Sequence, residues 1–315
     1  MRRGTTGAEP PQRNGGGETT SAAGFGASGS HAFGRWNRLG GILRLTHPFP
    51  TLMNMLATLL FAALALGTSP GWRVAVPLAL AIGGSQAAIG IANDLADRAL
   101  DRATKRRKPL AAGRVTLREA WVLLGVTLVT ATLGAARFGP LSLGLVALGT
   151  GLGLAYDLRL KRTALSWLPY LLAIPLEPIW VWVALGRFTP RLLWLYPIGG
   201  ALLLALHLAN ALADWHGDSA AGVNGLAQRL GRRRSQTILR VAALLPAGLA
   251  TALGLALPYR WERFGPGLAL ALLPIGASLM LVHRRPDDDA TYRTVFGLLL
   301  ASTIALAVAW LAGAL

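Results

Sequence analysis

Four polar side chains in one short stretch are spaced so that they could act together. Asn93, Asp94, Asp97 and Asp101 follow an apolar run, at the point where the chain should leave hydrocarbon. A helix turns about 100° and rises about 1.5 Å per residue, so the four side chains share about a third of its surface over about 12 Å. Because neighbouring carboxylates repel one another and are costly near lipid, this acidic stripe predicts a cation site.

A second stripe repeats the spacing further along the chain. Asn210, Asp214 and Asp218 stand at i, i+4 and i+8, and His207 falls on the same arc. We interpret His207 as a packed or hydrogen-bonded residue rather than a metal ligand. Each stripe precedes a basic stretch, "RATKRRKPLAAGR" after the first and "QRLGRRR" after the second. The matched arrangement predicts that the two stripes face each other in one site.

The residue types favour magnesium and a diphosphate as the occupants of that site. Mg²⁺ takes hard oxygen ligands, and water and substrate phosphate usually complete its coordination. The flanking Arg and Lys would neutralise the remaining phosphate charge. A single stripe could be explained by helix-end solvation and ion pairs, but the matched pair argues against this. The stronger rival is a cation-coupled transporter, although its carboxylates would be expected near the membrane midplane.

Composition indicates a membrane protein. The chain has 315 residues, of which 53% are hydrophobic and 14% charged, against about a quarter charged in a soluble domain. The apolar runs are too long for barrel strands, so we expect helices. The predicted spans are 46–67, 74–96, 118–136, 140–156, 166–186, 191–213, 237–257, 266–283 and 294–313. The predicted fold is an all-α polytopic membrane protein with nine transmembrane helices in a bundle.

Charge gives an orientation. The net charge is +17, which could suggest nucleic-acid binding, but Lys and Arg concentrate in alternate connections, as the positive-inside rule requires. We therefore expect no nucleic-acid partner, a cytoplasmic N-terminus, a C-terminus outside and a location in a prokaryotic cell membrane. Residues 1–40, rich in Gly and Ser, are expected to be a disordered tail before a domain at 41–315, and we expect no cleaved signal peptide. With no cysteine, thiolate chemistry is excluded.

Beyond these patterns, the chain resembles the UbiA superfamily of intramembrane prenyltransferases over about residues 40–315. Asn93-Asp94-x-x-Asp97-x-x-x-Asp101 resembles the first aspartate-rich motif of that family, and Asp214-x-x-x-Asp218 resembles the second. Nine spans also match. The supporting segments are "RLTHPFP" (44–50), "KPLAAGRVT" (108–116), "YDLRLKRT" (156–163) and "GVNGLAQRLG" (222–231).

The resemblance implies a reaction. Mg²⁺ held by both motifs would bind a polyprenyl diphosphate, the C–O bond would ionise to an allylic cation, and an acceptor would capture it with release of diphosphate. The leaving anion needs metal and basic groups, and the cation needs a dry, lipid-accessible central cavity. The expected acceptor is an aromatic quinone precursor. A non-aromatic lipid acceptor and cyclisation of the prenyl chain stay open.

The resemblance also implies roles for individual residues. The predicted metal ligands are Asn93, Asp97, Asp101, Asn210, Asp214 and Asp218, with Asp94 at the edge of the arc as a further candidate. Asn210 could instead be a packing polar group. The four aspartates other than Asp94, together with Tyr156 and Asp157 beside the cation or acceptor, form the predicted catalytic group. The candidate diphosphate contacts are Arg44, Lys105, Arg106 and Lys161.

Overall fold

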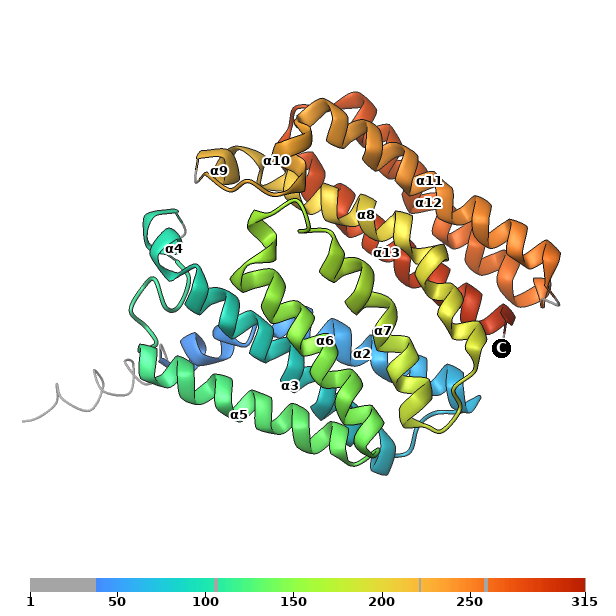
Figure 1. Cartoon of the computed structure of the whole chain (residues 1–315), viewed down its shortest axis with the longest axis horizontal. Helices are drawn as coiled ribbons and strands as arrows, with labels where there is room; N and C mark the ends of the chain where they lie inside the picture. Colours follow the sequence, from blue (N-terminus) through green and yellow to red (C-terminus); the bar gives the residue numbers. More distant parts are fainter. Residues whose placement is uncertain (1–37, 105–106, 221, 258–259, 315) are drawn as a thin grey trace, which may run out of the picture.

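The computed structural model describes residues 38–104, 107–220, 222–257 and 260–314, and nine long helices dominate that part of the chain (Figure 1). Eight of them are long and apolar enough to cross a membrane, and the ninth, α7, is a shorter apolar helix. The nine predicted spans are therefore confirmed as helices. They are α2 (Pro48–Leu66), α3 (Trp72–Ala96), α5 (Leu117–Ala136), α6 (Pro140–Leu158), α7 (Leu168–Ala184), α8 (Leu195–Ala213), α11 (Arg232–Ala256), α12 (Trp261–Arg284) and α13 (Asp289–Ala314).

A short helix precedes the first span in the described part of the chain. Residues 1–37 of the predicted tail lie outside the described residues. Residues 38–40 already belong to a short helix at 38–45, which precedes α2. Its Leu45 is fully buried and packs with Ile91 of α3 and Leu110 in a small apolar cluster. The segment before the first span therefore contributes to the core near the end of α3.

Short helices gather at one end of the bundle. The short helix α4 (Arg98–Thr104) follows α3, and α9 (Trp215–Ala220) and α10 (Leu226–Leu230) follow α8, all at the same end (Figure 1). The 3-10 turns η1 (Leu160–Arg162) and η2 (Pro190–Trp194) follow α6 and α7. Both acidic motifs start in a spanning helix and finish in one of these short helices, which puts them at the same end, as predicted.

Each motif contains a break in its helix at the same relative position. Asp97 ends α3 and Asp214 ends α8, and the chain then turns into the short helix. The i to i+4 backbone bonds survive these breaks, since the Asp101 amide donates to the Asp97 carbonyl at 2.8 Å and the Asp218 amide donates to the Asp214 carbonyl at 2.8 Å. The side chains thus keep their helical spacing while the axis changes direction.

Small residues let the spanning helices pack closely. A Cβ at Gly84 of α3 would lie 2.6 Å from the backbone nitrogen of Ala131, and a Cβ at Gly134 of α5 would lie 2.5 Å from that of Ala81. Membrane helices associate through such close backbone contact, since lipid provides no hydrophobic drive between them. Close packing of α3 against α5 fixes the helix that carries the first motif.

Candidate active site

The two acidic motifs meet in one cavity of about 250 Å³ at the end of the bundle where the short helices lie. The structure brings together most of the predicted residues there. The cavity is lined by Asn93, Asp97 and Asp101 of the first motif, by Asn210, Asp214 and Asp218 of the second, and by Tyr156, Asp157 and Lys161 between them. The juxtaposition expected from matched spacing alone is therefore present.

Two lysines neutralise the first motif. Lys161 donates from Nζ to Asp97 Oδ2 at 2.6 Å and to Asn93 Oδ1 at 3.0 Å. Lys108 bridges Asp94 Oδ1 and Asp101 Oδ2, at 2.8 Å to each. Burial lowers the pKa of Lys108, but the hydrogen bonds to Asp101 and Asp94 outweigh it, so the pKa lies above its ordinary value. Each ammonium marks a position where the acidic groups hold a cation.

Asp94 lies apart from the other acids. Its side chain is 2% exposed, is held between Lys108 and His47, and is not among the residues that line the cavity. His47 Nε2 lies 3.3 Å from Asp94 Oδ1. His47 caps α2 in a left-handed conformation, φ 50°, that a non-glycine residue adopts rarely. The absent side chain at Gly90 makes room for it, because a Cβ there would lie 2.7 Å from His47 Cδ2.

The second motif is held by a hydrogen-bonded serine. Ser166 is buried, shares a hydrogen bond of 2.9 Å with His207 Nε2 and accepts another from the Leu226 amide at 3.1 Å. A Cβ at Gly225 would lie 2.9 Å from the Lys161 carbonyl oxygen, so that residue must be small. These contacts fasten α10 against the segment that carries Lys161. The interpretation of His207 as a hydrogen-bonded residue is confirmed.

Aromatic rings separate the charged cavity from a deeper one. Tyr156, Tyr170 and His207 form an edge-to-face cluster with ring centroids 5.2 to 6.4 Å apart. The Asn210 amide donates to the Tyr170 hydroxyl at 3.5 Å, which places this predicted ligand beside the cluster as well as at the cavity.

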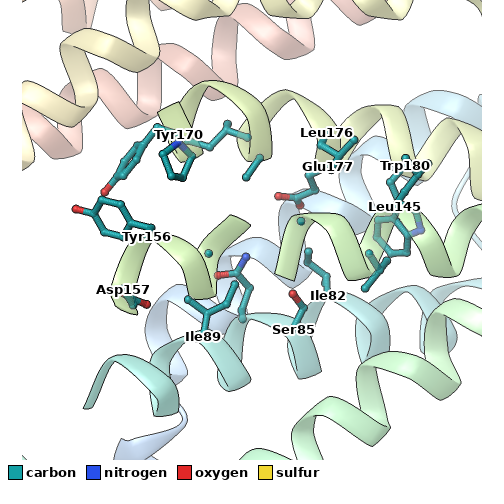
Figure 2. A pocket seen from close by; sticks show the side chains of 17 residues that line it. Ile82, Ser85, Ile89, Leu145, Tyr156, Asp157, Tyr170, Leu176, Glu177 and Trp180 are labelled. Carbon is teal, nitrogen blue, oxygen red and sulfur yellow. The ribbon is translucent and has the colours of Figure 1, made fainter. Parts of the chain in front are cut away.

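The deeper cavity is a chamber of about 320 Å³ between α3, α6 and α7 (Figure 2). Its wall is mainly apolar and includes Ile82, Ile89, Leu145, Ile174, Leu176 and Trp180. Tyr156 and Asp157 line both this chamber and the charged cavity. The two spaces therefore meet at these two residues.

Of the four candidate diphosphate contacts, Lys161 lines the cavity and Arg44 does not. Arg44 is exposed on the helix at 38–45 and does not line it, and Lys105 and Arg106 lie outside the described residues. The structure adds Lys108 and Arg162 instead, and Arg162 lies 3.6 Å from Asp97 Oδ1. Both belong to basic stretches of the sequence, so clustered positive charge is the signal that could have identified them. Nothing in the sequence pointed to Ser166.

The donor set suits Mg²⁺. The two motifs offer only carboxylate and amide oxygens, and Asp97 Oδ1 is buried without a hydrogen-bond partner. Within the described ranges, no three carboxylate or histidine side chains form a ready-made metal cluster. Mg²⁺ is usually held by one or two carboxylates, with water and substrate phosphate completing its coordination. The residues present therefore fit the group.

Comparison with known proteins decides the family. Residues 54–304 match the UbiA prenyltransferase family. The chain belongs to this family. It is accordingly a membrane-embedded prenyltransferase, as its sequence motifs indicated. A curated relative from Vibrio vulnificus (strain CMCP6), named 4-hydroxybenzoate octaprenyltransferase, is 27% identical over 249 residues, covering 78% of this chain and 87% of its own.

Solved structures share the fold. A UbiA homologue from Archaeoglobus fulgidus bound to GPP and Mg²⁺ has a TM-score of 0.69 at 21% identity, covering 86% of this chain and 99% of its own. A structure of digeranylgeranylglyceryl phosphate synthase has a TM-score of 0.69 at 16% identity, covering 88% and 98%. At these identities the likeness supports the nine-helix arrangement and leaves the substrates of this chain to be argued from its own site.

Proposed function

We propose that this chain transfers a polyprenyl group from a prenyl diphosphate to an aromatic acceptor, a quinone precursor, with Mg²⁺ as cofactor. One observation carries the proposal. A charged cavity and an apolar chamber meet at Tyr156 and Asp157, which is the arrangement required by a substrate with an anionic head and a hydrocarbon tail. The curated relative named 4-hydroxybenzoate octaprenyltransferase supports an aromatic acceptor.

The charged cavity binds the head of the donor. We assign Mg²⁺ binding to its two acidic motifs, that is, to Asn93, Asp97, Asp101, Asn210, Asp214 and Asp218. Bound there, the metal would offset the negative charge that develops on the leaving diphosphate. Lys161 and Arg162 lie in the same cavity and stabilise that charge by hydrogen bonds. Arg44, Lys105 and Arg106 are further candidates for diphosphate contact.

Asp94 has a different role in this proposal. It is buried against Lys108 and His47, so it orients Lys108, which also contacts Asp101. Direct metal binding by Asp94 would require Lys108 to leave it. The effect of Asp94 on the metal therefore acts through a neighbouring ammonium.

The allylic cation forms at the junction of the two spaces. The rings of Tyr156, Tyr170 and His207 present electron-rich faces there, and the Asp157 carboxylate adds negative charge. The apolar wall beyond them excludes water, which would otherwise capture the cation. An acceptor in the chamber then attacks C1 of the prenyl group, the C–O bond to diphosphate having broken, and loses a proton.

The topology proposed for the chain puts the active site on the cytoplasmic side. The connections at the end with α4, α9 and α10 contain Arg98, Arg102, Lys108, Arg162 and Arg229, which supports a cytoplasmic location for that end. The N-terminus is then cytoplasmic and the C-terminus outside, in a prokaryotic cell membrane.

Purified protein in detergent tests the proposal. It should consume prenyl diphosphate and form a prenylated aromatic product only when Mg²⁺ is present, and Asp97→Ala and Asp214→Ala should abolish both. Glu262→Ala, at an exposed acid in the first turn of α12, is the matched control and should keep full activity. Undiminished turnover in both aspartate variants would refute the site assignment. A prenyl product formed without acceptor would indicate cyclisation, and a prenylated lipid would indicate a lipid acceptor.

A further inference from the structure

The apolar chamber contains an acid that the proposed chemistry does not use. Glu177 lies in the middle of α7 and lines the chamber, as Figure 2 shows. It follows Tyr170 by seven residues, which places it about 10 Å deeper along the helix. Within the described part of the chain, Thr58 Oγ1 of α2 donates a hydrogen bond to Glu177 Oε1 at 2.8 Å.

An acid at this depth needs a physical reason. Ionisable residues inside a membrane are costly, and they mark positions where a polar ligand or ion must be bound. Among the residues that the structure describes, no lysine or arginine lines the chamber. A carboxyl group can accept more hydrogen bonds than the single one from Thr58. A ligand in the chamber can therefore add a donor to Glu177.

The polar groups near Glu177 indicate where in the chamber that ligand would bind. Ser85 and Gln86 of α3 also line the chamber. Ser85 is already paired with Thr150 Oγ1 at 2.7 Å. Glu177 and Gln86 are thus the side chains that offer polar atoms to an occupant at this depth. A prenyl tail has no hydrogen-bonding group to pair with either side chain, whereas an acceptor that bears a hydroxyl group does.

We propose that Glu177 and Gln86 form a subsite for a hydroxyl group of the acceptor, and that Glu177 selects neutral hydroxyl-bearing rings against rings with a carboxylate at that position. The proposal rests on the proposed transfer to an aromatic acceptor. A hydroxyl donates a hydrogen bond to the Glu177 carboxyl group. A carboxylate there would face a second acid and be repelled or left without a donor.

The test compares two acceptors that share one ring and one activating hydroxyl, namely hydroquinone and 4-hydroxybenzoate. For each, kcat and KM are measured with wild type, Glu177→Gln, Glu177→Leu and the exposed control Glu262→Gln, and the Kd for the prenyl diphosphate with Mg²⁺ is measured separately. Wild type should favour hydroquinone. Both Glu177 variants should reduce that preference by about tenfold or more, mainly through KM, because a hydrogen bond to the acceptor is lost or changed.

The donor provides the internal control. Its Kd should be unchanged in the Glu177 variants, because the diphosphate end of the site is a separate cavity. An unchanged acceptor ratio, a wild-type preference for 4-hydroxybenzoate, or a loss of donor binding in both variants would each overturn the proposal. If the Glu177 variants do not fold, Gln86→Leu takes their place, since it removes the amide of the subsite and leaves Glu177 unchanged. A ratio unaffected by Gln86→Leu would then overturn the proposal. If the wild-type enzyme prenylates neither hydroquinone nor 4-hydroxybenzoate, the result would instead refute the proposed function.

Discussion

Removing the Lys161 ammonium should lower both the stability of the protein and its activity, and a second substitution should restore only the stability. In Lys161→Met, Asp97 would lose its contact at 2.6 Å and, among the described residues, keep Arg162 at 3.6 Å, whose side chain is 55% exposed. Because Lys161 and Asp97 are themselves 17% and 16% exposed, the pair is largely buried, and leaving one charged partner should cost about 1–3 kcal/mol of unfolding free energy. A methionine keeps the length of the side chain.

The double variant Asp97→Asn/Lys161→Met should recover most of that loss, because no uncompensated charge remains. Prenyl transfer should stay reduced by about 10²–10³ in kcat in both variants, since a group that stabilises the leaving anion is missing. Apparent Tm in detergent and kcat measure the two effects. A double variant as unstable as Lys161→Met would refute the ion-pair reasoning, and an active Lys161→Met would refute the role in the leaving-group step.

Three further predictions test other parts of the molecule. Folding raises the pKa of Lys108 above its ordinary value of 10.5. Its contribution to the free energy of unfolding is therefore complete below pH 10.5 and is lost as the pH rises through the pKa of the folded state. Melting curves measured at alkaline pH should show this loss in wild type and not in Lys108→Met. Gly134→Val should lower the apparent Tm sharply, since the added Cβ meets backbone at 2.5 Å, whereas Gly125→Val, with nothing within 4 Å, should not. Tyr156→Leu should lower kcat more than it weakens donor binding, because its ring lies where the charged cavity meets the apolar chamber; equal losses in both would contradict this assignment.

The spans and the two motifs were predictable from sequence because their signals are local. Hydrocarbon forces the backbone to satisfy its own hydrogen bonds, so a long apolar run can only be a helix here. The i, i+4, i+8 spacing survives in the structure even across the breaks at Asp97 and Asp214, because the backbone bonds continue through them. Spacing therefore identified the cavity-lining acids before any tertiary contact was known.

Pairings between distant segments were not predictable from that spacing. Asp94 lies on the same predicted arc as its neighbours, yet it is buried against Lys108 and His47, which the arc could not indicate. The contacts of Lys108 with Asp94 and Asp101 likewise depend on how the connection folds back. Glu177 is a different case. It lies within the predicted span 166–186, where an ionisable side chain is itself a signal of function that can be read from the sequence.

The helix breaks bear on how one site could bind a diphosphate anion and also protect an allylic cation from water. The cavity walls that bear charge include Asp101 on α4 and Asp218 on α9, which are short helices beyond the ends of the spans. The chamber wall comes from α3, α6 and α7, which are long, closely packed helices. Because the backbone bonds continue through the breaks at Asp97 and Asp214, the acid beyond each break still lines the cavity. The proposed diphosphate site therefore lies one aromatic layer away from the apolar chamber in which the cation would be protected from water.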